Sequence, residues 1–92
     1  MITLDTIISR KKDILTAEVA GEVVLMSVSH WRYFGLNAVG SDIWKRLENT
    51  QSVSDLCADL ADAYQGDAEA IERDVLELLA KLDERNLLEK PA

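Results

Sequence analysis

Trp31-Arg-Tyr-Phe-Gly-Leu-Asn-Ala-Val-Gly-Ser-Asp-Ile-Trp44 is the stretch that decides the fold, because it passes from an extended pattern to a helical one. Residues 32 to 36 are rich in aromatic and apolar side chains, as in a β-strand. Asn37 then suits the N-cap of a helix that is expected to end near Asn49. Its apolar side chains recur four residues apart, at Val39, Ile43 and Leu47. The stretch has no catalytic group, so it predicts a docking surface rather than an active site.

Two further β-type runs precede this stretch. Ile14 to Ala20 alternates in the manner of a strand, and Val23 to Val28 is an apolar run. Gly21 lies between them and predicts a tight hairpin turn. With Arg32 to Leu36 as the third strand, the spacing predicts an antiparallel meander in which that third strand forms an edge. The first dozen residues and the last four show no such pattern and are expected to be loose.

Two more helices are expected after residue 50. Ser52 is the predicted N-cap of the first, and Gly66 is suited to a left-handed conformation at its end. The apolar stripe of this helix comprises Val53, Leu56, Cys57, Leu60, Ala61 and Tyr64. The other helix covers about residues 67 to 85, with Asn86 in a left-handed exit and Leu87-Leu88-Glu89 returning to the body. Three strands followed by three helices give an α+β fold.

Charge and composition limit the classes of function. The net charge is -7, and residues 49 to 92 hold eleven acids against four bases, whereas residues 1 to 48 hold six of each. Such a surface disfavours nucleic acid and anionic lipid and favours a partner with basic groups, or it simply maintains solubility. The chain has one cysteine, no signal-peptide pattern and no apolar run of membrane-spanning length. These features predict a single cytoplasmic domain, with no membrane partner.

Catalytic and metal sites are not indicated. His30 and Cys57 are the single residues of their types, so they cannot supply a zinc site of several ligands. Cys57 is expected to be a buried apolar residue, and His30 a solvated turn residue. The carboxylate pairs of the last helix are expected to form a solvated face, and the four glycines are isolated, so no phosphate-binding loop is present. The sequence therefore predicts no catalytic residue, no metal and no cofactor.

DNA binding is the alternative from a different class, because helix-turn-helix folds often place a helix in the major groove. The last helix, over residues 67 to 85, carries seven acids and three bases. A groove-reading helix needs an excess of Lys and Arg for phosphate contacts. Only the modest Arg10-Lys11-Lys12 cluster would supply such contacts, so the charge pattern disfavours this alternative.

Several short motifs carry a resemblance to a known family: Tyr33-Phe34-Gly35-Leu36-Asn37, Val39-Gly40, Ile43-Trp44, Ser52-Val53, Asp74-Val75 and Asn86-Leu87-Leu88. From about residue 14 to residue 88 the chain resembles the PqqD-like domains that recognise ribosomally made precursor peptides. It is most similar to the discrete leader-binding proteins of lasso-peptide pathways. The resemblance implies a winged helix-turn-helix fold and a non-catalytic protein that delivers a leader peptide to a leader peptidase. A PqqD-like peptide chaperone for a radical-enzyme pathway is the alternative within the same fold.

The resemblance also implies where a leader binds. In the family, the leader adds a fourth strand beside the third strand and packs on the third helix, a form of β-strand addition. The peptide-binding residues expected here are Arg32, Tyr33, Phe34, Gly35, Ile71, Asp74, Val75 and Leu78. Whether Tyr33 or Phe34 faces the groove depends on strand register, and Val75 and Leu78 are equally compatible with an ordinary core role. The core is expected to include Ile43, Trp44, Leu47 and Leu79.

Overall fold

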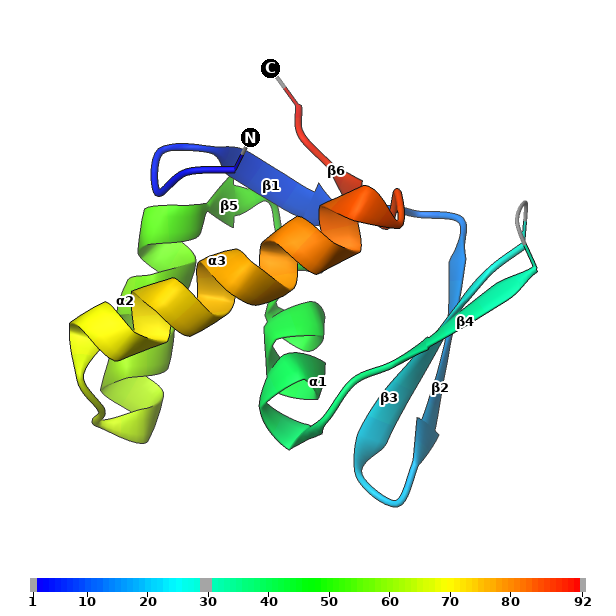
Figure 1. The fold of residues 1–92 in the computed structure, drawn as a ribbon, viewed down its shortest axis with the longest axis horizontal. Helices are drawn as coiled ribbons and strands as arrows, with labels where there is room; N and C mark the ends of the chain where they lie inside the picture. Colours follow the sequence, from blue (N-terminus) through cyan, green and yellow to red (C-terminus); the bar gives the residue numbers. More distant parts are fainter. Residues whose placement is uncertain (1, 29–30, 92) are drawn as a thin grey trace.

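The computed structural model describes residues 2–28 and 31–91, which form an α+β fold (Figure 1). The elements in chain order are β1 (Ile7–Arg10), β2 (Ile14–Val19), β3 (Glu22–Ser27), β4 (Arg32–Gly35), α1 (Ala38–Arg46), β5 (Gln51–Ser52), α2 (Val53–Tyr64), α3 (Ala68–Glu84) and β6 (Leu88–Glu89). Two small sheets are present in this part of the chain, in the orders β2-β3-β4 and β5-β1-β6. The predicted winged helix-turn-helix arrangement is confirmed.

The β2-β3-β4 meander has the predicted strand order. β2 and β3 pair from Ile14↔Ser27 to Val19↔Glu22, which leaves Ala20 and Gly21 as a two-residue loop. Both loop residues have positive φ angles, 53° and 83°, as a type I′ hairpin requires. β4 then pairs with β3 alone, so it forms one edge of the sheet. In Figure 1 this sheet stands to one side of the helices, as a wing.

A buried serine of α1 fixes the helix to the two strands that concern the site. The Ser41 hydroxyl accepts a hydrogen bond from the Val23 backbone N–H at 2.8 Å and donates one to the Leu36 carbonyl at 3.3 Å. Asn37 caps the helix as predicted, because its side chain accepts from the Gly40 N–H. The path from β4 into α1 is therefore fixed at both ends. Helical turns continue past Arg46, and the expected end near Asn49 was three residues too late for the regular helix.

The N-terminal segment differs from the sequence expectation of a loose end. β1 pairs with β5 on one side and with β6 on the other, and the Ile8 side chain is fully buried. Its neighbour Ile7 is 42% exposed. A strand of four residues gives too short a pattern to be recognised in sequence, and its partners lie more than forty residues away. The pairing with β6 confirms that Leu88–Glu89 returns to the body.

The ends of α2 and α3 set the direction of the chain around the site. Ser52 caps α2 as predicted, but Gln65 takes the left-handed conformation that was expected of Gly66. Asn86 has the predicted positive φ, 62°. The N–H groups of Asn86 and Leu87 bond to the carbonyls of Asp83 and Leu82, which is a Schellman motif. This motif fixes the last turn of α3 opposite β4.

One apolar core joins the helices to the inner face of the wing. Its buried members are Ile8, Val23, Leu25, Leu36, Ile43, Trp44, Leu47, Val53, Leu56, Cys57, Leu60, Val75, Leu79, Leu82, Leu87 and Leu88. The core roles predicted for Ile43, Trp44, Leu47 and Leu79 are confirmed, as is the burial of Cys57. Val39, expected on the same helix face, is 49% exposed. Within residues 2–28 and 31–91, no helix has the length and apolar character needed to cross a membrane.

Candidate functional site

The outer edge of β4 presents backbone groups that β3 does not use. The Leu36 N–H donates to the Val23 carbonyl at 2.8 Å, so the backbone of Leu36 faces β3. Backbone direction alternates along a strand, and therefore the N–H and C=O groups of Tyr33 and Gly35 point away from β3. Among the described residues, no strand pairs with this edge. It offers two donors and two acceptors to another extended chain.

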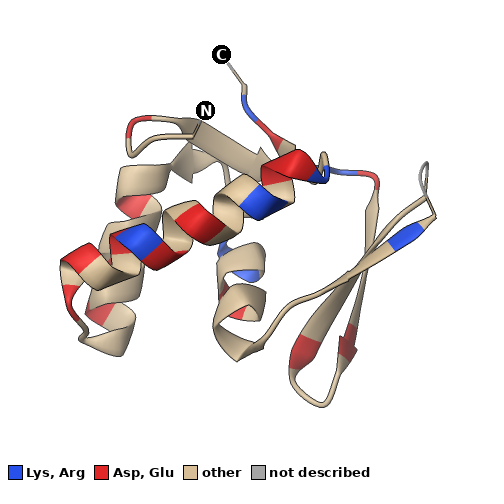
Figure 2. Cartoon of the chain, in the orientation of Figure 1, with Lys and Arg blue, Asp and Glu red and all other residues tan. Residues whose placement is uncertain are grey.

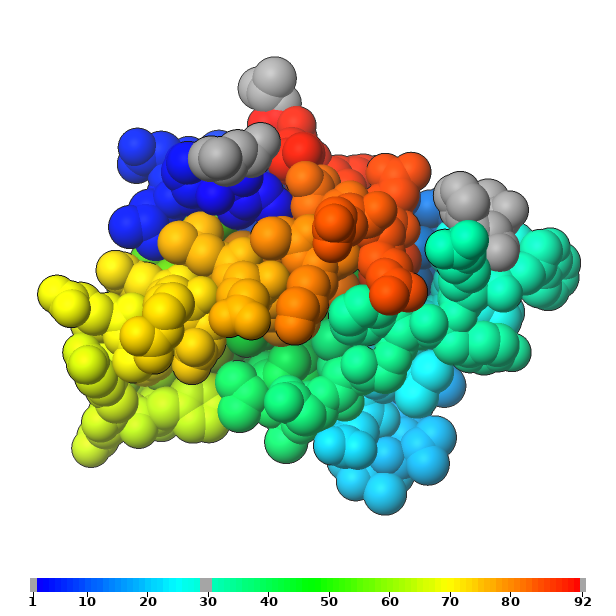
Figure 3. Space-filling model, in the orientation of Figure 1, coloured from blue at the N-terminus to red at the C-terminus, as the bar shows by residue number. Residues whose placement is uncertain are grey.

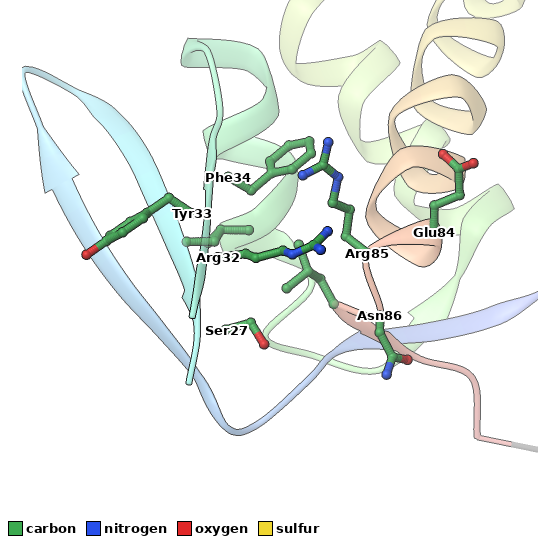
Figure 4. A pocket seen from close by; sticks show the side chains of 9 residues that line it. Ser27, Arg32, Tyr33, Phe34, Glu84, Arg85 and Asn86 are labelled. Atoms are coloured by element: carbon green, nitrogen blue, oxygen red, sulfur yellow. The ribbon is translucent and has the colours of Figure 1, made fainter. Parts of the chain in front are cut away.

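Side-chain direction on β4 answers the question left open by the sequence. Phe34 pairs with the buried Leu25, is partly buried against the core, and faces α3. Tyr33 is 70% exposed and extends from the opposite face of the sheet (Figure 4). The Arg85 guanidinium lies over the Phe34 ring, 5.2 Å from its centroid. Phe34 is thus the aromatic residue that borders the space between β4 and α3.

A cavity of about 410 Å³ occupies that space. Its lining residues come from β3, β4 and the end of α3: Leu25, Ser27, Arg32, Tyr33, Phe34, Glu84, Arg85, Asn86 and Leu87. We call it the strand pocket. Figure 4 shows the Arg32 and Arg85 side chains reaching into the same region from opposite sides, while Glu84 points away. The strand pocket combines an apolar floor with two cationic groups.

A second cavity, of about 540 Å³, lies between the three helices. Its lining residues are Asn37, Val39, Gly40, Ile43, Leu60, Tyr64, Ile71, Asp74, Val75, Glu77, Leu78 and Lys81. We call it the helix pocket. In Figure 3, α3 crosses the visible face of the molecule, with α1 and β4 along the same side of it. The two pockets therefore lie along the same helix and form a candidate groove beside α3.

The charges along this groove differ between its ends. The helix pocket carries Asp74, Glu77 and Lys81 on its rim, and Lys81 lies 3.9 Å from Glu77. Acidic residues are frequent along α2 and α3, where the ribbon is red in Figure 2. The strand pocket instead carries two arginines and one glutamate. The groove thus runs from an acidic end near α2 to a basic end near β4.

A short hydrogen bond closes one side of the helix pocket. The Tyr64 hydroxyl donates to Asp42 Oδ2 at 2.6 Å, and Arg46 contacts the other oxygen of the same carboxylate at 3.0 Å. Burial acts to raise the pKa of Asp42, but these hydrogen bonds, together with the positive charges of Arg46 and Lys45, outweigh it and lower the pKa below its ordinary value. The hydrogen bond to Asp42 raises the pKa of Tyr64. The contact links α1 to the end of α2.

The structure divides seven of the eight predicted site residues between the two pockets. Arg32, Tyr33 and Phe34 line the strand pocket, and the four predicted residues of α3 line the helix pocket. Gly35 lines neither but lies on the open edge. Val75 is only 2% exposed and belongs to the core, which answers the open question for that residue, whereas Leu78 is half-buried. His30 lies outside the described residues.

The sequence reasoning missed Lys81 and the residues at the end of α3, including Arg85. A signal was available, because Leu78, Lys81 and Arg85 follow one another at helical spacings of three and four and so share a face of α3. In contrast, nothing in the sequence pointed to Val39 and Tyr64, whose place in the helix pocket depends on how α1 and α2 pack. In the part of the chain that the structure describes, no three His, Cys, Asp or Glu side chains gather in a way that would hold a metal ion.

The chain matches a known protein family. The family described as coenzyme PQQ synthesis protein D (PqqD) matches residues 22–88. The chain belongs to the PqqD family. The matched region includes β4, α1 and α3, and therefore both pockets of the candidate groove. The family predicted from the sequence is confirmed. A comparison with curated proteins gives no match.

Three solved structures resemble this PqqD-family chain. TbiB1, in complex with the TbiA(beta) leader peptide, is 33% identical, with a TM-score of 0.80 over 91% of this chain and 98% of the other. The PqqD part of PqqCD from Methylobacterium extorquens, described as a functional stand-alone recognition element for ribosomally synthesized and modified peptides, is 22% identical, with a TM-score of 0.82 over 98% and 96%. A lasso peptide synthetase B1 complexed with its leader peptide is 24% identical, with a TM-score of 0.76 over 89% and 96%. The last two likenesses support the shared fold.

Proposed function

We propose that this PqqD-family protein binds the leader of a ribosomally made precursor peptide, as a non-catalytic recognition protein of a lasso-peptide pathway. The observation that carries the proposal is the open edge of β4 beside an apolar groove. A leader in extended conformation pairs its backbone with the outward groups of Tyr33 and Gly35. Alternate leader side chains then enter the space between β4 and α3. The complex of the 33% identical TbiB1 with a leader peptide supports this assignment.

The bound leader is delivered to a separate leader peptidase, which removes it from the precursor. Strand addition suits this role, because the protein holds only the leader backbone and a few side chains and leaves the rest of the precursor accessible. The groove offers no group with an evident catalytic role, since its carboxylates lie on the exposed rim. Cys57 lines neither pocket, and burial raises the pKa of its thiol. A PqqD-like chaperone for a radical-enzyme pathway is the second candidate. Genome neighbours distinguish the two.

The direct test is a titration of the purified protein with a fluorescein-labelled leader peptide, taken from the smallest reading frame beside this gene. Fluorescence polarisation should saturate with a dissociation constant of about 1 μM or lower. Unlabelled leader should compete with the labelled one. A folded protein that shows no saturable binding would overturn the proposal. A duplex DNA probe tests the regulator alternative in the same assay, and the acidic α2–α3 surface predicts no binding to it.

A substitution in the groove separates binding from stability. Leu78 is half-buried in the helix pocket, so Leu78→Asp should weaken leader binding at least tenfold while the domain remains folded by circular dichroism. Val75→Asp is unsuitable for this purpose. Its side chain is 2% exposed, and a buried unpaired carboxylate would unfold the domain. Unchanged affinity in folded Leu78→Asp would contradict the groove placement on α3.

A further inference from the structure

The strand pocket contains two arginines, Arg32 and Arg85. Among the described residues, no carboxylate oxygen lies within ion-pair distance of Arg32 or Arg85. Glu84 belongs to the same pocket but points away from it (Figure 4). The whole chain has a net charge of -7, and five of its eight other Lys and Arg side chains form ion pairs. The strand pocket is therefore locally positive, although the protein as a whole is negatively charged.

The backbone that carries each arginine is fixed, and the Arg85 guanidinium also has a ring contact. Arg85 lies at the end of α3, where the Schellman motif holds the backbone, and its guanidinium rests on the Phe34 ring. Arg32 is two residues before Phe34 on β4, so its side chain leaves from the same face of the strand. Its backbone is paired with Ser27 of β3. The two groups thus approach the cavity from two different elements.

We propose that the strand pocket binds an acidic side chain, Asp or Glu, of the peptide strand that docks on β4. This inference rests on the proposed function and adds the chemical class of one leader residue. A strand added to β4 lies about 4.8 Å from it, with alternate side chains on the face that carries Arg32 and Phe34. A carboxylate on that face reaches both guanidinium groups, and guanidinium is suited to bidentate hydrogen bonds with a carboxylate. Phe34, Leu25 and Leu87 contact the methylene carbons of the same side chain.

The alternative for Arg32 is protection of the sheet edge. Charged side chains on edge strands prevent pairing between copies of a protein, without any ligand. That role predicts nothing about Arg85, which lies on a helix, and it does not require an acid in the peptide. The two explanations therefore differ in the response of peptide binding to the loss of both arginines.

The test measures binding of the fluorescein-labelled leader to Arg32→Gln/Arg85→Gln. Both side chains are exposed, so the variant is expected to fold. The double variant should bind about tenfold to hundredfold more weakly than the wild type. The control is Lys11→Gln/Lys12→Gln, which removes the same charge from a different cavity, between β1 and β2. It should change affinity less than threefold, and added NaCl should weaken wild-type binding more than that of the arginine variant.

A second arm changes the peptide. Each Asp or Glu of the leader is replaced in turn by Asn or Gln, and one replacement should reduce wild-type affinity as much as the arginine variant does. Combining that peptide with the arginine variant should add little further loss, because both changes remove the same contact. If the wild type binds the leader and the arginine variant binds equally tightly, this inference fails and edge protection explains Arg32. If the wild type binds no leader, the proposed function itself fails.

Discussion

Replacing Gly35 with proline tests strand addition at a single atom. The Gly35 N–H points away from β3, so proline removes a donor that only an added strand would use. Gly35 has no positive φ, and a Cβ at this position meets no atom within 4 Å. Phe34 is in a strand, the conformation that a residue before proline prefers. The free energy of unfolding should therefore change by less than about 1 kcal/mol.

The loss of binding follows from the number of backbone bonds affected. One hydrogen bond contributes about 1 kcal/mol net, which is roughly fivefold in the dissociation constant. The proline ring also stands where the peptide backbone must approach, so the neighbouring bond to Tyr33 weakens as well. The expected total is about 2 kcal/mol, or roughly thirtyfold. Fluorescence polarisation with the labelled leader measures it, with Gly35→Ala as the matched control because alanine keeps the N–H. Equal affinity of the folded proline and alanine variants would refute pairing at this edge.

Two further predictions concern the framework of the groove. Ile8→Ala should lower the free energy of unfolding in urea by about 2–5 kcal/mol, because Ile8 is fully buried. Ile7→Ala, on the exposed face of the same strand, should lower it by less than about 1 kcal/mol. Equal losses in the two variants would mean that β1 is not part of the cooperative fold. Tyr64→Phe should raise the pKa of Asp42 in an NMR titration, because the hydrogen bond that lowers it is lost. The lowered pKa of Asp42 stabilises the wild type at neutral pH. This contribution disappears as the pH falls below the ordinary value of 3.8, through the folded-state pKa. An unchanged pKa of Asp42 in Tyr64→Phe would show that Tyr64 does not lower that pKa.

The wing and the three helices could be predicted from the sequence because each carries a local signal. The two-residue loop at Gly21, the cap at Asn37 and the left-handed exit at Asn86 all depend on neighbours a few residues apart. The short strands β1 and β5 could not, because the pairing of Ile8 with Gln51 is a long-range event. The left-handed residue after α2 was misplaced by one position, from Gln65 to Gly66, because either residue could have ended that helix.

The candidate site was predictable only in part. The resemblance placed it between β4 and α3, and the structure puts those residues in two pockets rather than one. The side-chain direction of Phe34 required the strand register, which a one-residue slip would invert. Helical spacing places Arg85 on the same face as Leu78 and Lys81, but its position over Phe34 depends on where α3 ends relative to β4. Packing between elements distant in sequence determines both features, and no local pattern encodes it.

The outward backbone groups of β4 have a consequence for the protein in the absence of its peptide. An unpaired edge does not distinguish a leader from any other extended chain, and every further copy of the protein brings an edge of its own. The short length of β4 and the charge of Arg32 disfavour such self-association. A peptide that occupies the edge removes it from competition altogether. If the leader binds at this strand as we propose, its binding would also keep the molecules apart as their concentration rises.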